Sequence, residues 1–460
     1  MAETQVYSRK QLAALTQDAK DGKPDAKKYI IVDNKLYDVT EFVDDHPGGA
    51  AVLLTHVGKD ASDVFHAMHP DSAYELLANY YVGDLEPETA VPDDAGKNNS
   101  AAFAREMRDL RDNLKAQGYF HASKIYYIYK VLSTLGICGL SLLMLYLWGK
   151  TSLLAVIGAG LLMGLFWQQC GWLAHDFGHH QCFDDRQTND AVVIFLGDFC
   201  QGFSLSWWKN KHNTHHASTN VHGHDPDIDT APILLWDEYA SANYYGSFQG
   251  EPGTVSRFFA ENVLPYQTRY FFFILAFARL SWAIQSFLYM LNEGAINKSA
   301  RLCLFERVSL ALHWIIFTYV TIAWIDTIPR MILFFLVSQT ATGYLLALVF
   351  ALNHNGMPVI SQEKAESMEF FEIQVITGRD VSLGPIGDWF MGGLNYQIEH
   401  HVFPSMPRHN LRKVKPMVQS ICKKYNIKHH DTSFLNGILE VLKTLDVIEK
   451  LSLRLSKKAF

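Results

Sequence analysis

The sequence predicts a multi-domain protein in which a small α+β domain is followed by an α-helical membrane domain of about four transmembrane helices plus interfacial helices. Three observations predict this class. The N-terminal part alternates short apolar and polar runs, four later stretches are apolar over bilayer-spanning lengths, and a polar segment separates the two parts. We therefore expect an α+β domain over 1–86, a linker and pre-membrane segment over 87–124, and a membrane domain over 125–460.

The composition limits the class of protein. Hydrophobic residues make up 49% and charged residues 19% of the chain, which leaves apolar surface beyond the needs of a soluble core. The formal net charge is -7 and no basic cluster carries interleaved aromatic residues, so nucleic acid is excluded as a partner. The six cysteines form no CxxC pair, which argues against a zinc ribbon or a disulfide framework.

The first region has the pattern of a small folded domain. Residues 29–37 predict two short strands around a turn, and helical pieces follow. The polar start of the chain resembles no signal peptide, so we expect this domain in the cytosol. From residue 84 to about residue 100 the chain is rich in Pro, Glu, Asp, Gly and Asn, as expected for a solvated connector.

Four apolar stretches are long enough to cross a bilayer. They form two pairs, each joined by a short turn: 127–148 with 152–174, and 308–325 with 331–352. Two further stretches, 191–208 and 269–291, are interrupted by polar residues, and we expect interfacial helices there. This topology keeps the histidine motifs on one membrane face, which the basic tail after Arg408 marks as cytosolic.

A histidine in a tight Pro-Gly-Gly loop stands out in the first region. His46 precedes Pro47, Gly48 and Gly49, and glycines let the backbone approach a flat ligand closely. With a second histidine, His69, further along, residues 6–86 resemble the cytochrome b5 domain. The resemblance implies that His46 and His69 are the axial ligands of haem b, with His66 as an alternative to His69. Two axial imidazoles would leave no open position for oxygen and make the haem an electron carrier.

Acidic residues surround this loop. They could form a docking rim for a basic reductase, although solvated surface is the simpler interpretation. The residues concerned are Asp44, Asp45, Asp60 and Asp63.

Three histidine clusters lie close to expected membrane ends. Their spacings of three and four residues place the imidazoles on one helical face. The clusters are His175, His179 and His180; His212, His215 and His216; and Gln397, His400 and His401. Unpaired polar groups near a bilayer are costly and tend to mark function, so we expect these clusters to bind metal jointly. His180 could ligate in place of His179 or support it by a hydrogen bond.

The number of histidines and the fused domain indicate which metal is bound. Zinc needs three or four protein ligands and does no redox chemistry, whereas these clusters offer seven histidines even without His180, enough for two ions. A fused electron carrier therefore favours two non-haem iron ions that react with O₂ and attack an unactivated C–H bond. His354, at the end of the last span, is a candidate eighth histidine ligand. Asp225, Asp227 and Asp229 could orient imidazoles or belong to a polar loop, and they are left out of the ligand set.

Over nearly its full length the chain resembles front-end acyl-lipid desaturases, and fungal delta-6 desaturases in particular. The resemblance rests on the His46 loop, on clusters of the forms HDxGH, HxxHH and QxxHH, and on the phrase over 392–401 in which Gln397 replaces a histidine. It implies O₂-dependent desaturation between an existing double bond and the carboxyl end of a polyunsaturated acyl chain. Linoleoyl and α-linolenoyl chains would give γ-linolenoyl and stearidonoyl products.

The same resemblance implies the partners and the location. NADH would supply electrons indirectly, through a separate NADH-cytochrome b5 reductase, and the acyl chain would arrive as a phospholipid or a coenzyme A ester. The membrane would be that of the endoplasmic reticulum. Delta-5, delta-8 and sphingolipid desaturation remain open, as does acyl hydroxylation. A membrane-anchored haem protein that only relays electrons is the alternative from another class.

Overall fold

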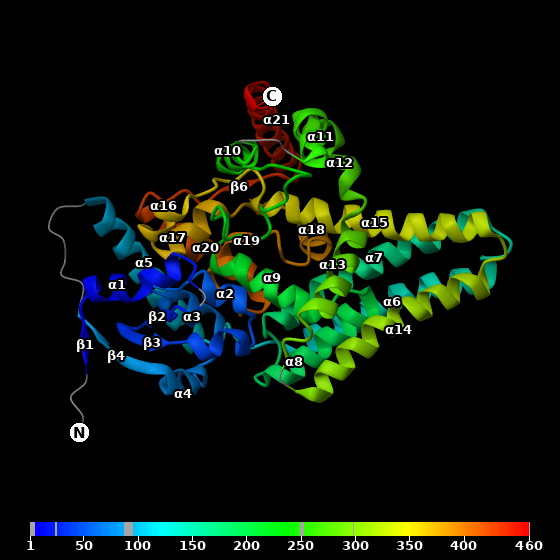
Figure 1. The fold of residues 1–460 in the computed structure, drawn as a ribbon. Helices are drawn as coiled ribbons and strands as arrows, with labels where there is room; N and C mark the ends of the chain where they lie inside the picture. The colour runs from blue at the N-terminus through cyan, green and yellow to red at the C-terminus, as the bar shows by residue number, and fades with distance from the viewer. Residues whose placement is uncertain (1–4, 24, 87–94, 249–252, 298, 460) are drawn as a thin grey trace.

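The computed structural model describes residues 5–23, 25–86, 95–248, 253–297 and 299–459, so residues 87–94 of the expected connector lie outside it (Figure 1). The N-terminal domain contains a four-stranded sheet with the strand order β1-β4-β3-β2. The strands are β1 (Val6–Tyr7), β2 (Tyr29–Val32), β3 (Lys35–Asp38) and β4 (Tyr81–Leu85). β1 pairs parallel to β4, and the other two pairings are antiparallel.

The expected hairpin over residues 29–37 is present as β2 and β3. Asp33 and Asn34 form its turn with φ angles of 52° and 58°, a conformation that short polar side chains tolerate better than others. Short helices complete the domain: α1 (Arg9–Lys20), η1 (Thr40–Asp45), α2 (Ala50–Leu54), α3 (Ser62–Met68), α4 (Ala73–Leu77) and η2 (Ala78–Tyr80). The predicted α+β class of this region is confirmed.

Helix α5 (Ala95–Ala116) joins the N-terminal domain to the rest of the chain. Phe103, Met107 and Leu114 on one face are buried against the C-terminal part of the protein, where α5 packs on α17 (Phe370–Thr377) and α20 (Arg408–Lys424). The stretch expected to be a solvated connector up to about residue 100 is therefore helical from Ala95. Its first turns are polar, and the apolar repeat that indicates a helix begins only at Phe103.

In the described part of the chain, four helices are long and apolar enough to cross a membrane, which confirms the expected spans. They are α6 (Lys124–Trp148), α7 (Leu153–Gly178), α14 (Ala300–Trp324) and α15 (Ile328–His354). At 25 to 27 residues, each is about 38–40 Å long, which exceeds the hydrocarbon core. α7 packs against both α6 and α15, and the two short turns lie together at the right of Figure 1. α14 begins at Ala300 rather than at residue 308, because the helix continues through charged residues that end the apolar run.

The two stretches expected to be interfacial helices are bent helix pairs, and each pair taken together is long and apolar enough to form a broken span or a re-entrant loop. In the first, α8 (Arg186–Val193) continues into the π-helix η3 (Ile194–Gln201) and meets α9 (Leu205–Ala217) at 110°. In the second, a helical stretch ending with α12 (Gln267–Leu275) meets α13 (Ala278–Asn292) at 84°. Gly202 has φ 87° at the first bend, and Ser204 begins α9 by accepting a hydrogen bond from the backbone N–H of Trp207.

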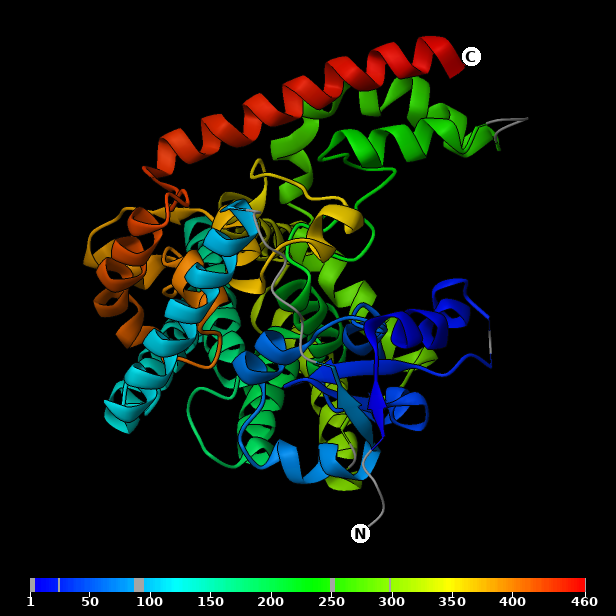
Figure 2. The same ribbon diagram turned by 90° about the vertical axis from the view of Figure 1, so that its left-hand side faces the viewer.

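The remaining elements cover the end of the bundle that carries the histidines. They are α10 (Glu238–Gly246), α11 (Thr254–Asn262), η4 (Leu264–Tyr266), α16 (Gln362–Glu366), β5 (Asp380–Val381), α18 (Pro385–Phe390), α19 (Gln397–Val402), β6 (Asp431–Thr432) and α21 (Phe434–Ala459). The long α21 lies across α10, α11 and α12 (Figure 2). The short α19 is completely buried and contacts α17, α20 and β5.

Candidate metal centre and adjoining cavity

Five buried imidazoles form the first histidine group. His175 lies in the last turn of α7, and His179 directly follows that helix. His212 and His216 come from α9, and His400 comes from α19. Their ligand nitrogens lie within 4.8 Å of one another. The Nε2 atom of His212 is 2.9 Å from that of His179 and 3.0 Å from that of His216, and His400 Nε2 is 3.2 Å from His216 Nε2. The ring nitrogens therefore converge on a common point.

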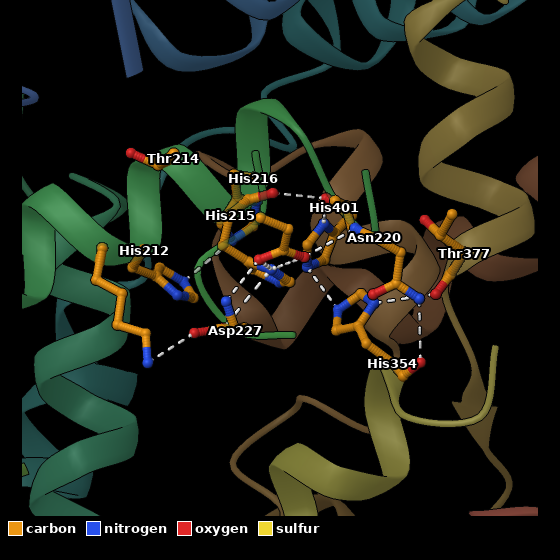
Figure 3. Close-up of polar contacts among 12 residues, drawn as sticks. His212, Thr214, His215, His216, Asn220, Asp227, His354, Thr377 and His401 are labelled. Carbon is orange, nitrogen blue, oxygen red and sulfur yellow. Dashed lines mark hydrogen bonds and ion pairs between the residues drawn. The ribbon is translucent and has the colours of Figure 1, made fainter. Parts of the chain in front are cut away.

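Three further imidazoles form the second histidine group. His215 of α9, His354 at the end of α15 and His401 of α19 face one another, as Figure 3 shows. The Nε2 atoms of His354 and His401 are 3.0 Å apart. The side-chain amide of Gln397 lies 2.8 Å from His354 Nε2, so this group has an amide beside its three imidazoles.

Helix periodicity explains why two groups arise from so few elements. His215 and His216 are neighbours on α9, and neighbouring helical residues point about 100° apart, so each joins a different group. His400 and His401 divide between the groups in the same way on α19. The nine residues expected as ligands thus lie together, eight of them as members of the two groups and Gln397 beside the second group. The alternative ligand His180 belongs to neither group.

Hydrogen bonds from the opposite ring nitrogen orient the second histidine group. His215 Nδ1 is 2.9 Å from a carboxylate oxygen of Asp225, His354 Nδ1 is 3.0 Å from the carbonyl oxygen of Thr377, and His401 Nδ1 is 2.9 Å from Gln374 Oε1. Each acceptor leaves Nε2 as the nitrogen available to a metal ion. The orienting role considered for Asp225 is therefore present in the structure. Gln374 and Thr377 carry no signal in the sequence, because they meet the histidines only through the fold.

The electrostatics of the groups favour neutral imidazoles. Burial lowers the pKa of His179 to about 3, and burial with neighbouring histidines holds the pKa values of His212, His216 and His400 well below the usual range. His215 is the exception: burial lowers its pKa, but the carboxylates of Asp225 and Asp227 outweigh burial and raise it. The buried Nε2 of His175 has no hydrogen-bond partner. A cluster of neutral, convergent nitrogens with an unpartnered member fits a metal site.

A second cluster of two histidines lies in the N-terminal domain. The ring centroids of His46 and His69 are 5.9 Å apart. His46 Nδ1 is 2.8 Å from the carbonyl oxygen of Gly49, and His69 Nδ1 is 3.2 Å from that of Phe65, which leaves both Nε2 atoms for a ligand. Two imidazoles bonded over about 2 Å to opposite sides of one metal ion have centroids about 6 Å apart. The pair therefore fits one haem iron between the rings.

A cavity of about 450 Å³, referred to below as the haem cavity, opens beside these two rings, and the membrane domain forms one of its walls. His46 and His69 line it from one side, and His179 and His180 line it from the other. Burial lowers the pKa of His46, and the positive charges of Arg186 and Lys209 in the membrane domain lower it further. His179 thus belongs both to the first histidine group and to the wall of this cavity.

The structure bears on two expectations about the N-terminal domain. His66 lies away from the cavity, with Nε2 2.9 Å from an Asp33 carboxylate oxygen, so the ring that lies beside His46 is that of His69. Asp63 is buried and accepts two hydrogen bonds from Arg108 of α5, at 2.7 and 2.8 Å. Asp63 therefore belongs to a contact within the chain rather than to an open acidic rim.

The fold and the two sites fit one class of protein, a redox enzyme with helices of membrane-spanning length and a fused haem domain. Comparisons with known proteins show its family. The family model "Fatty acid desaturase" matches residues 151–433, and the model "Cytochrome b5-like Heme/Steroid binding domain" matches residues 11–86. The chain therefore belongs to the fatty acid desaturase family, with a cytochrome b5-like domain before the desaturase domain.

Three relatives illustrate the range of this family. An acyl-lipid (9-3)-desaturase of Physcomitrium patens is 36% identical over 446 residues, 95% of this chain and 78% of the relative. A Delta(8)-fatty-acid desaturase of Euglena gracilis is 34% identical over 420 residues, 91% of this chain and 94% of the relative. The Delta(6)-fatty-acid desaturase fat-3 of Caenorhabditis elegans is 35% identical over 427 residues, 88% of this chain and 93% of the relative. The expected front-end desaturase with a haem domain is confirmed, and the two histidine groups are compatible with the iron that the family implies.

Proposed function

We propose that this protein is a delta-6 desaturase that converts linoleoyl and α-linolenoyl chains into γ-linolenoyl and stearidonoyl chains. In this proposal haem b lies between His46 and His69, and the two histidine groups hold two iron ions. The ligands of one ion are His175, His179, His212, His216 and His400, and those of the other are His215, His354 and His401, with Gln397 beside them.

One observation carries the proposal: the haem cavity and the first histidine group share His179. A single imidazole therefore separates the place where electrons arrive from the place where they are used. A domain that carries electrons has a role next to iron and none next to zinc. Electrons from NADH reach the haem domain through a separate cytochrome b5 reductase in this proposal.

The chain's own residues prepare the metal centre. Bound iron supplies the reduction of O₂ and the oxidation of an unactivated C–H bond. Asp225, Gln374 and the Thr377 carbonyl hold the Nε2 atoms of their histidines toward one point, which keeps the ligands preorganised. All eight grouped histidines are buried, so bulk water is excluded from the centre.

The proposed location is the endoplasmic reticulum membrane, with the haem domain and both histidine groups on the cytosolic face. The histidine groups lie at the end of the four apolar helices that also carries the haem domain (Figure 1). The basic residues of α20, including Arg412, Lys413 and Lys415, support this orientation by the positive-inside rule. The acyl chain is carried as a phospholipid or a coenzyme A ester.

Delta-8 desaturation is the second candidate. The relative from Euglena gracilis carries this activity in its name and aligns over 94% of its own length. Regiochemistry depends on the distance between the bound head group and the iron centre, and small differences in that distance move the new double bond.

Expression in a yeast that lacks this activity, fed defined fatty acids, tests the proposal. Linoleic and α-linolenic acids are expected to yield γ-linolenic and stearidonic acids, with double bonds located by mass spectrometry. A new bond only in longer di- or trienoic acids contradicts delta-6 activity and indicates delta-5 or delta-8. A hydroxylated product contradicts desaturation. If His212→Ala leaves the acyl products unchanged, the histidine groups do not catalyse the reaction, which supports the alternative that the protein only relays electrons.

A further inference from the structure

The haem cavity has two chemically different halves. The part of its lining that comes from the N-terminal domain is apolar apart from His46, His69 and a few neutral polar groups, and it includes no lysine or arginine among the described residues. Both cations on the wall, Arg186 and Lys209, belong to the membrane domain. Haem carries two propionate groups, so a cavity with cations on one wall has one side suited to its anionic edge.

The two cations differ in how they are engaged. Lys209 Nζ is 2.6 Å from a carboxylate oxygen of the buried Asp190, and Asn297 donates to the other oxygen of that carboxylate at 2.9 Å. Arg186 donates to the backbone carbonyl of Met68, next to His69, at 2.8 Å. Within the described part of the chain, Arg186 forms no ion pair with a carboxylate. Its charge is therefore the one on this wall without an anionic partner at contact distance.

We propose that Arg186 binds a haem propionate, so that the membrane domain completes the haem site of the N-terminal domain. This proposal rests on the haem site of the proposed function. A guanidinium group offers several N–H donors in one plane, so it can keep its bond to Met68 and still donate to a carboxylate. Lys209 is already paired with Asp190, so it contributes less than Arg186 to binding of the propionate.

The consequence concerns the orientation of the haem. An anchored propionate places the charged edge of the haem on the wall that also carries His179 and His180. The haem is then fixed relative to the first histidine group by its own substituent as well as by the docking of two domains. Arg186 acts as a positioning residue for electron delivery. Its removal is expected to change the binding and the reduction potential of the haem and to leave the ligands of the iron centre unchanged.

The full-length protein in lipid nanodiscs provides the test. In Arg186→Gln, haem transfer to an excess of apomyoglobin is expected to become about tenfold faster, because a charge-assisted hydrogen bond is lost. The reduction potential of the haem is expected to fall, because a nearby positive charge favours the reduced form. Arg186→Lys keeps the charge and is expected to retain most of the potential.

Asn213→Ala is the matched control. Asn213 donates to the carbonyl of Gly48 at 2.9 Å, so this variant also loses one side-chain bond to the backbone of the N-terminal domain, but without loss of charge. We expect its haem potential to equal that of the wild type. Equal effects of Arg186→Gln and Asn213→Ala on both readouts, or no effect of Arg186→Gln, overturn the proposal.

Haem dimethyl ester, whose propionates are uncharged, gives a second test that does not depend on one variant. Esterification is expected to speed haem loss from the wild type and to have little effect on haem loss from Arg186→Gln. If Arg186→Gln does not fold, Arg186→Lys replaces it and is expected to show a smaller effect than the wild type. The same effect in wild type and variant overturns the role of Arg186. Absence of haem absorption from the wild-type protein contradicts the haem site of the proposed function. Haem that binds to the wild type but whose loss rate and reduction potential do not change in the Arg186 variants contradicts only the present proposal.

Discussion

The hydrogen bonds of single imidazole rings decide which nitrogen faces the centre. In the second histidine group, three different acceptors engage Nδ1: a carboxylate of Asp225, the Gln374 amide and a backbone carbonyl. Asp225 is itself fixed, because it accepts hydrogen bonds from the backbone N–H groups of Asn220 and Asp227 at 2.7 and 2.8 Å. Its carboxylate is therefore held rigidly against His215.

Replacing Asp225 tests this arrangement. In Asp225→Asn the side chain keeps its shape but loses the charge that strengthens His215 as a ligand, so we expect iron affinity to fall about ten- to hundredfold. Chelator competition with metal analysis measures this change. Asp229→Asn, at an exposed position four residues away, is the control and is expected to bind iron normally. Equal iron retention in both variants contradicts the role of Asp225.

Gln397 lies beside His354 in the second histidine group. We expect Gln397→Ala to reduce product yield about tenfold or more, while the unfolding midpoint shifts by less than about 4 °C, because the loss is one of geometry at the metal centre. Gas chromatography of fed yeast and thermal unfolding in detergent measure the two effects. Gln117→Ala, at an exposed position of the chain, is the control. An unchanged yield argues against a role for Gln397 at the metals.

The candidate ligands were predictable from the sequence because their spacing along the chain determines which side chains share a helical face. Histidines three and four residues apart share a helical face wherever the helix lies. Their assignment to two groups was not predictable, since it depends on the directions from which α9 and α19 meet. His180 illustrates the same limit: it follows His179 directly, but φ of 56° turns the chain there, and the residue lines the haem cavity instead.

The positions of the histidines depend mainly on where the helices end and bend. The first bent pair turns by 110° around Gly202, and after this turn α9 carries His212 and His216 beside His175 of α7. At Gly202 a Cβ atom would meet the ring of His313 of α14. The apolar run over 191–208 gives no sign of the bend, because its cause is a glycine conformation together with a contact to another helix.

A substitution at this bend tests its structural importance. We expect Gly202→Ala to lower the free energy of unfolding by about 1–3 kcal/mol, because the residue has φ 87° and its new methyl group would contact His313. Thermal unfolding in detergent measures the change. Gly136→Ala in α6, where a Cβ meets nothing within 4 Å, is the control and is expected to be neutral or slightly stabilising. Equal stability of the two variants would show that the bend tolerates a side chain.

In the whole molecule, the N-terminal domain and the membrane domain meet at a contact formed by specific side chains. Arg108 of α5 holds the buried Asp63 of the N-terminal domain by two hydrogen bonds, and Asn213 and Arg186 of the membrane domain bind its backbone. The sequence predicted the two domains and their order. It could not predict their docking, because Arg108, Asp63 and Arg186 are ordinary surface charges until the fold brings them together.

Charge reversal at this contact tests the docking. Arg108→Glu sets a carboxylate against Asp63, and we expect the rate of product formation at saturating reductase to fall about tenfold, because like charges separate the domains. Adding Asp63→Arg restores an opposite-charge pair and is expected to recover much of the rate. A single variant as fast as the wild type, or a double variant no faster than the single one, contradicts a functional contact.

The most direct measurement concerns delivery of electrons through the fused haem. Purified wild-type protein and His46→Ala, each in nanodiscs with reductase, NADH, O₂ and a linoleoyl substrate and with no other haem protein, are compared for product and for iron content. We predict that His46→Ala forms no product while its iron content stays at the wild-type level, because His46 lines the cavity proposed for the haem and belongs to neither histidine group. Product formation by His46→Ala at a rate near that of the wild type would contradict the account.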